Sequence, residues 1–268
     1  MEAHAAQSFK NQPMHARVIK FEHPLNERYR FFLRLEYLFN LLEYHLPGES
    51  SENSHTAISV LLDIINVISR TDIKTETFKE LDRIAGVLAP LKDKPGIELG
   101  RLDEILSDLK QLSTQLRTIT GPIDKDLKDD DLLKALQLRN NISGGLCDFD
   151  LPAYRYWLRQ PAERRQHDLQ TWLTPFRPLQ YAIENALNLV RQSSAAERQV
   201  AEDGVYKQSL DPKIPCQLIV VSLPGNTAYF AEFSGSRHRF TVRFLDATQR
   251  HPLQTTDTVE FDLSCCKL

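Results

Sequence analysis

Residues 237–245 alternate between charged and apolar side chains, and they read Arg237-His238-Arg239-Phe240-Thr241-Val242-Arg243-Phe244-Leu245. Successive side chains of a β-strand point to opposite faces, so this alternation predicts a strand with one apolar and one basic face. The predicted buried face holds Phe240, Val242 and Phe244. The predicted exposed face holds Arg237, Arg239, Thr241 and Arg243.

The basic face has two interpretations that the strand alone leaves open. No acidic residue lies between Glu232 and Asp246 to neutralise the arginines along the chain. Guanidinium groups bind carboxylates and phosphates bidentately, so the row could dock an acidic segment of a partner. Alternatively, it is a solvated strand face whose charges deter edge-to-edge pairing of sheets.

Short strands separated by turn signals surround this segment. Residues 217–223, 227–233 and 256–263 have strand character, and Asp203-Gly204 indicates a hairpin or bulge in an earlier strand pair. Turns are indicated by Pro224-Gly225-Asn226 and Ser234-Gly235-Ser236. Consecutive short strands predict an antiparallel sheet of four or five strands, with the helical region covering one face.

From about Leu25 to Gln192 the apolar period is helical. The predicted stripes are Phe31, Leu35, Leu38 and Leu42; Ala57, Leu61, Ile64/Ile65 and Ile68, with Ser54 as N-cap; Phe78, Leu81, Ala85 and Leu88, with Thr75 as N-cap; and Leu179, Ile183, Leu187 and Val190. His23, before Pro24, is expected to help start the first helix. Trp157 and Trp172 are expected to be core anchors.

A coiled-coil-like seam marks one of these helices. Its apolar residues alternate strictly at spacings of three and four: Leu102, Ile105, Leu109, Leu112, Leu116 and Ile119. The preceding helix and this one are predicted to form an antiparallel hairpin. The seam either packs only within the chain or also forms a dimer interface.

The sequence therefore predicts an α+β protein, with an N-terminal helical domain containing a coiled-coil-like hairpin and a C-terminal antiparallel β-sheet domain. The expected domains are a flexible extension over 1–20, a mainly helical domain over 21–195 and a β-strand domain over 196–268. Within the helical domain, 131–165 is a segment that could pack with the sheet.

Composition and motifs favour a binding protein over an enzyme. The net charge of −3 over 268 residues argues against a general nucleic-acid binder, and no run approaches the roughly 18 apolar residues of a membrane span. Four cysteines without C-x-x-C spacing are expected to be free thiols in a reducing cytoplasm. No phosphate-binding, nucleophile or zinc motif occurs, so we expect no catalytic residue, metal or cofactor.

Several strings, in this order along the chain, resemble the ZapD (Z ring-associated protein D) family of bacterial cell-division proteins. They are Phe21-Glu22-His23-Pro24-Leu25-Asn26-Glu27, Lys79-Glu80-Leu81-Asp82-Arg83, Gly144-Gly145-Leu146-Cys147-Asp148-Phe149-Asp150-Leu151-Pro152, Arg239-Phe240-Thr241-Val242-Arg243-Phe244 and Phe261-Asp262-Leu263-Ser264-Cys265-Cys266. The resemblance runs from about Val18 to Cys266. The extension from Met1 to Arg17 has no counterpart in it.

The resemblance implies a cytoplasmic homodimer at the division site that binds the C-terminal tail of FtsZ, the tubulin-like division protein. Two tail sites per dimer would cross-link and bundle FtsZ filaments. The family's basic tail-binding positions match Arg70, Arg139, Arg239 and Arg243, and Arg237 is a basic neighbour by the strand alternation. A further helix is expected from about Lys128 to Arg139. The family also tends to be basic at the start of this fifth helix, where this chain reads Asp126-Leu127-Lys128-Asp129-Asp130-Asp131.

Two other classes of function remain as alternatives. One is an uncharacterised enzyme whose polar residues converge only in the fold. The other is an RNA-binding protein that uses the arginine-rich strand and its aromatic residues Phe240 and Phe244. The alternation argues against RNA binding, because those aromatics lie on the face opposite the arginines.

Overall fold

The computed structural model describes residues 18–70, 72–140, 142, 144–147, 149–236 and 238–268. The chain is α+β, and its described residues divide into two compact units, one within 31–187 and the other combining 18–30 with residues from 188–268. The chain crosses from one unit to the other within helices α1 and α8. The segment 131–165 belongs to the helical unit.

The helices are α1 (Glu27–His45), α2 (Ser51–Ser69), α3 (Ile73–Leu88), α4 (Leu99–Thr118), α5 (Asp131–Arg139), α6 (Pro152–Leu158), α7 (Ala162–Leu173) and α8 (Arg177–Gln192). Short 3-10 turns occupy Ala89–Asp93, Asp126–Asp129 and Thr174–Phe176. The strands are β1 (Val18–Pro24), β2 (Glu197–Ala201), β3 (Val205–Ser209), β4 (Leu218–Pro224), β5 (Tyr229–Ser236), β6 (Arg239–Asp246) and β7 (Val259–Cys266).

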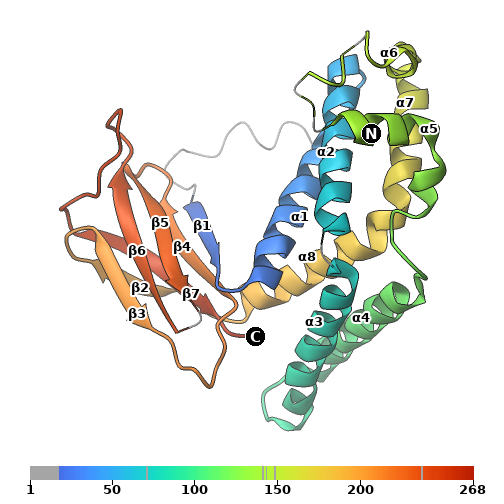
Figure 1. Ribbon diagram of the computed structural model, residues 1–268. Helices are drawn as coiled ribbons and strands as arrows, with labels where there is room; N and C mark the ends of the chain where they lie inside the picture. The colour runs from blue at the N-terminus through green and yellow to red at the C-terminus, as the bar shows by residue number, and fades with distance from the viewer. Residues whose placement is uncertain (1–17, 71, 141, 143, 148, 237) are drawn as a thin grey trace, which may run out of the picture. The chain divides into compact units, whose positions relative to one another are not determined.

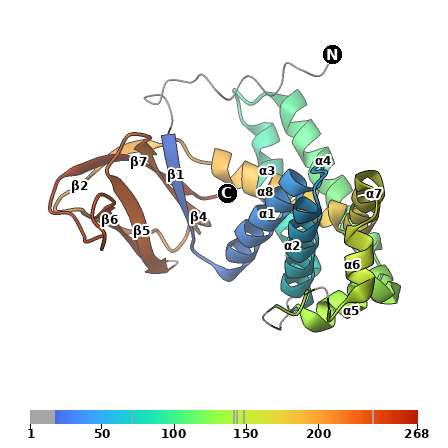
Figure 2. The same cartoon turned by 90° about the horizontal axis from the view of Figure 1, so that it is seen from above.

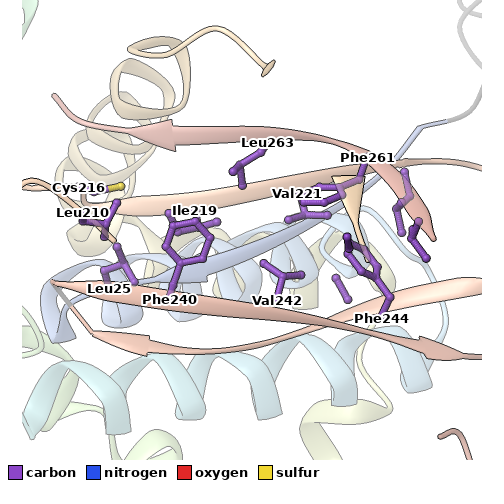
Figure 3. Packing of buried hydrophobic residues seen from close by; sticks show 14 residues of the cluster. Leu25, Leu210, Cys216, Ile219, Val221, Phe240, Val242, Phe244, Phe261 and Leu263 are labelled. Atoms are coloured by element: carbon purple, nitrogen blue, oxygen red, sulfur yellow. The ribbon is translucent and has the colours of Figure 1, made fainter. Parts of the chain in front are cut away.

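The β-unit has two antiparallel sheets, with strand orders β1-β4-β7-β2 and β3-β6-β5. Apolar side chains from both sheets share one core, in which the Phe244 and Phe261 rings lie 4.9 Å apart (Figure 3). The prediction of a single sheet of four or five strands was therefore wrong. The second sheet covers the face of the first sheet that carries Ile219, Val221, Phe261 and Leu263.

Strand β1 was missed by the sequence analysis. Val18, Ile19 and Lys20, which were assigned to the tail, pair with β4 (Figure 2), and His23 lies in this strand rather than at the start of a helix. The alternation covers only Ile19-Lys20-Phe21-Glu22, and this short segment stands alone before a long helical region. Residues 1–17, the rest of the predicted extension, lie outside the described residues.

A tight turn connects β2 to β3 and so joins the two sheets. Asp203 and Gly204 have positive φ angles of 50° and 66°, as the predicted Asp-Gly turn requires. A Cβ atom on Gly204 would lie 2.3 Å from the backbone oxygen of Thr255, so only glycine fits this approach.

In the helical unit, α3 and α4 pack side by side as the predicted hairpin (Figure 1). Leu102, Leu109 and Leu116 of the seam are buried in it. Trp157 and Trp172 are buried as expected, and their rings lie 5.6 Å apart.

Both predicted helix caps were wrong. Ser50, not Ser54, caps α2 by accepting a hydrogen bond from the Asn53 backbone, and Asp72, not Thr75, caps α3. Each observed cap lies three or four residues before the predicted one. In both helices the first turn contains another polar residue that could also act as an N-cap, and the sequence pattern did not distinguish the two. Ser54 is buried inside α2, where its hydroxyl binds the guanidinium group of Arg165.

The buried stripe of α1 differs in part from its prediction. Leu35 and Leu42 are buried, but the other core positions belong to Phe32 and Phe39. Their neighbours Phe31 and Leu38 are half-buried and line a groove instead. Phe31 and Phe32 are adjacent apolar residues, as are Leu38 and Phe39, so the helical period alone did not indicate which residue of each pair is buried.

Candidate functional site

The predicted phase of β6 is confirmed. Phe240, Val242 and Phe244 are at most 1% exposed and point between the two sheets (Figure 3), whereas Arg239 and Arg243 are exposed. Both guanidinium groups therefore belong to the outer side of the sheet β3-β6-β5. Arg237, the third predicted arginine of this row, lies outside the described residues.

The strand register gives this outer side its full composition. Arg239 lies opposite Ser209 and Ser236, Thr241 lies opposite Lys207 and Ser234, and Arg243 lies opposite Val205 and Glu232. We call this surface the arginine face, defined by Lys207, Ser209, Glu232, Ser234, Ser236, Arg239, Thr241 and Arg243. It is a mainly cationic surface with hydroxyl groups at its edges.

Two members of the arginine face were not recognised in the sequence. Lys207 is exposed and adds a third cation one strand away from the arginines. Glu232 is directly across from Arg243 in the register, so the arginine row has an acidic neighbour that reading along the chain did not reveal. Alternation within Val205–Ser209 could have placed Lys207 on the exposed side, but its pairing with β6 depends on the fold.

The arginine face is hollowed at the Arg239 end. A shallow pocket of about 650 Å³ is lined by Arg239 and Lys207 together with Ser209, Ser234 and Ser236. Guanidinium, ammonium and hydroxyl groups are all hydrogen-bond donors, and two of them carry positive charge. This set of donors suits a carboxylate ligand, whose oxygens accept hydrogen bonds and are negatively charged.

Arg70 and Arg139 belong to the helical unit, so the structure assigns the predicted arginines to two different units. Arg139 forms an ion pair with Asp150, with 2.8 Å between Nη1 and Oδ1. The Asp150 carboxylate therefore already neutralises the charge of the Arg139 guanidinium group. Arg139 is therefore less available to a ligand than the arginines of the arginine face.

Arg70 is exposed at the C-terminal end of α2 and lines a groove of about 500 Å³ between α1 and α2. We call this the α1–α2 groove. It also contains Arg34 and Asp63, with Phe31 among its apolar residues. Burial raises the pKa of Asp63, while a hydrogen bond from Asn140 opposes the shift. The groove thus combines two cations, an acid and aromatic surface.

Arg34 is a second basic residue that the sequence analysis missed. Its guanidinium group lies 5.9 Å from the centre of the Phe31 ring. A cation over an aromatic ring is held in place while keeping hydrogen-bond donors for a ligand. Its position on the outer side of α1, within reach of the end of α2, becomes visible only in the fold.

The described residues contain no group of three or more histidine, cysteine, aspartate or glutamate side chains arranged to hold a metal ion. Within the same residues, no helix combines the length and the apolar character needed to cross a lipid bilayer. Phe240 and Phe244 are buried, so neither ring is available for stacking with a nucleotide base.

Comparison with known proteins places the chain in a family. Residues 33–243 match the model of the ZapD family, described as a cell division protein. The chain belongs to the ZapD family. It is 37% identical to cell division protein ZapD of Methylococcus capsulatus over 93% of this chain and 98% of that protein. The corresponding proteins of Chromobacterium violaceum and Coxiella burnetii are 35% and 34% identical, each over its full length.

The ZapD match extends over both compact units. It begins inside α1 and ends at Arg243, so it includes Arg34, Asp63 and Arg70 of the α1–α2 groove and the described arginines of the arginine face. The predicted family is thus confirmed, and with it a role in cell division. The basic surfaces described above lie within the part of the chain that defines the family.

Proposed function

We propose that this protein binds the C-terminal tail of FtsZ at the arginine face and, as a homodimer, cross-links and bundles FtsZ filaments. The observation that carries the proposal is the exposed row of Arg239 and Arg243, supplemented by Lys207 on the neighbouring strand. Membership of the ZapD family adds the cell-division context. The protein would act in the cytoplasm, at mid-cell, without catalysis or a cofactor.

The arginine face suits an extended acidic segment. Arg239 and Arg243 are four residues apart on one strand, which separates their Cα atoms by about 13 Å at roughly 3.3 Å per residue. Carboxylates spaced along an extended peptide could reach both guanidinium groups at once. The serine hydroxyl groups beside Arg239 would add neutral hydrogen bonds. Binding of this kind depends on charge and should weaken as salt is added.

The other predicted arginines have lesser roles in this proposal. Arg70, together with Arg34, offers a secondary basic surface in the α1–α2 groove. Arg139 contributes least, because Asp150 already neutralises it. Arg237 extends the row by sequence, but it lies outside the described residues.

Cross-linking needs two tail sites per particle, and a dimer supplies them. Each site is shallow and its single contact is weak, but a filament presents many tails to the second site once the first is occupied. The buried leucines of the α4 seam already pack against α3 in the described hairpin. We therefore expect the dimer to use another surface of the helical unit.

Sedimentation with purified FtsZ tests the proposal. The protein should pellet with polymerised FtsZ and remain in the supernatant when the FtsZ tail is deleted. The double variant Arg239→Glu/Arg243→Glu should fail to pellet while keeping its circular dichroism spectrum. A matched control with the same charge change is Lys213→Glu/Arg250→Glu, since both residues are exposed in the same unit. Equal pelleting with tail-less FtsZ would contradict tail binding.

A further inference from the structure

The arginine face changes character beyond Arg243. The next residue of β6 on the same side of the sheet is Leu245, and the strand register pairs it with Phe230 of β5. On the other side of β6, Val205 of β3 is directly opposite Arg243. We call Val205, Phe230 and Leu245 the apolar patch. Arg243 thus has apolar side chains both beside it and beyond it.

Strand alternation places the apolar patch on the outer side of the sheet. Each member is adjacent in the chain to a residue that forms or packs against the core between the sheets, and these neighbours are Tyr206, Ala231 and Phe244. Successive side chains of a strand point to opposite sides, so the patch points away from that core. All three residues of the patch remain partly exposed. The patch is therefore accessible to a partner.

The outer side of the sheet is consequently polar at one end and apolar at the other. At the Arg239 end, the shallow pocket is lined by cationic and hydroxyl groups. At the Arg243 end, Leu245 lies two residues further along β6, about 7 Å away at roughly 3.3 Å per residue. A bound segment that carried only acidic residues would leave the apolar patch in contact with water. A segment with an apolar residue at this place would cover the patch.

Glu232 disfavours an acidic residue over the apolar patch. It is exposed and two residues from Phe230 on β5, so it lies on the same side of the sheet. A carboxylate placed above Phe230 would be repelled by Glu232, whereas an apolar side chain would not. Burial of apolar surface on binding is favourable without any charge. The charge and the apolar surface at this end thus fit the same kind of residue.

Taking the arginine face as the FtsZ-tail site proposed above, we infer that it recognises a mixed segment rather than acidity alone. A large aliphatic or aromatic residue of the tail covers the apolar patch, and an acidic residue two positions away binds Arg243. Side chains two residues apart share one side of an extended chain, so this spacing matches that of Arg243 and Leu245. Further acidic residues reach Arg239. The apolar contact supplies specificity, because many acidic segments satisfy the arginines equally well.

Threonine substitutions in the protein test the apolar patch. Phe230→Thr/Leu245→Thr removes most of its apolar surface while keeping residues that favour strands. This variant should bind a fluorescent FtsZ tail peptide at least about tenfold more weakly in anisotropy titrations, since a large apolar side chain of the peptide is no longer buried. Its salt dependence should equal that of the wild type, because no charge is changed. Val200→Thr/Ile214→Thr, at exposed apolar positions of the same unit, should bind normally.

Peptide variants test the same contact with the wild-type protein, so they do not depend on how a protein variant folds. Each large apolar residue of the tail peptide is replaced in turn by serine, with all acidic residues kept. At least one replacement should weaken binding to the wild type about tenfold, yet change binding to Phe230→Thr/Leu245→Thr no more than about twofold, since that contact is already lost there. A polyglutamate peptide of the same net charge should bind at least about tenfold more weakly than the tail peptide.

Three results would each overturn the inference: every serine-substituted peptide binds as tightly as the parent, polyglutamate binds as tightly as the tail peptide, or a folded Phe230→Thr/Leu245→Thr keeps the wild-type affinity. If melting curves show that this variant is unfolded, the peptide series decides. In each of the three cases, loss of tail binding by Arg239→Glu/Arg243→Glu would leave the proposed tail site standing. Absence of tail binding by the wild type would contradict both the inference and the proposed function.

Discussion

Phe244 shows how much of the fold depends on single buried side chains of β6. It is completely buried, and its ring packs against that of Phe261. We predict that Phe244→Ala lowers the free energy of unfolding by about 3–5 kcal/mol, the usual cost of truncating a buried phenylalanine. Arg243→Ala, one position away but exposed, should change it by only about 0–1 kcal/mol. Denaturant melts of both variants check this, and a silent Phe244→Ala would contradict the assigned strand phase.

Glu232 offers a gain-of-function test at the arginine face. It lies across from Arg243 in the register of β5 and β6, so it competes with a ligand carboxylate for that cation. Glu232→Gln should tighten binding of an acidic peptide up to about fivefold at low salt, since cross-strand charge pairs contribute less than about 1 kcal/mol. Titration of a labelled peptide at two salt concentrations measures the effect. Weaker binding by the variant would mean that Glu232 is a ligand contact.

His23 predicts a pH dependence of stability. Burial, followed by repulsion from Arg30, lowers its pKa below the ordinary 6.5, and its ring stacks on Phe233 at 5.2 Å. As the pH falls below 6.5, His23 therefore takes up a proton more readily in the unfolded chain than in the folded protein. The contribution of neutral His23 to the free energy of unfolding is complete above pH 6.5 and is lost as the pH falls through the lowered pKa. His23→Phe should flatten the pH dependence of unfolding below 6.5, whereas His251→Phe, at an exposed position, should not.

At the scale of elements, Arg165 holds three helices together. It is 5% exposed, its Nε donates to Ser54 of α2 at 2.9 Å, and its other nitrogens donate to backbone carbonyls of Glu49, Leu158 and Gln160. Arg165→Ala should therefore cost about 3 kcal/mol or more, because several buried hydrogen-bonding partners would be left unsatisfied. Arg164→Ala, at the exposed neighbouring position, is the matched control. Equal melting curves for the two variants would contradict this role.

Element types could largely be predicted from the sequence, whereas their partners could not. The alternation of Phe240, Val242 and Phe244 determined the phase of β6, and the leucine spacing of α4 predicted its hairpin. The second sheet and strand β1 depend on pairing between segments far apart in the chain, which no local period encodes. For the same reason Lys207, Glu232 and Arg34 became candidate site residues only once the fold was known.

At the scale of the whole molecule, the proposed function depends on valence. We predict a homodimer, so light scattering at micromolar concentration should give about twice the chain mass of 30.8 kDa. Substitutions that dissociate the dimer should preserve binding of a tail peptide but end the bundling of FtsZ filaments, because one site cannot bridge two filaments. Filament bundling by a protein of monomeric mass would show that the two tail-binding sites do not come from dimerisation.

The most direct test of the central claim is the binding of a fluorescent FtsZ C-terminal tail peptide, followed by anisotropy. The wild type and Lys213→Glu/Arg250→Glu should bind equally, with an affinity that falls as salt rises. Arg239→Glu/Arg243→Glu should bind at least about 30-fold more weakly, since it removes two charge-assisted hydrogen-bonding groups. If the double variant of Arg239 and Arg243 is folded and binds the peptide as tightly as the wild type, the arginine face is not the tail site.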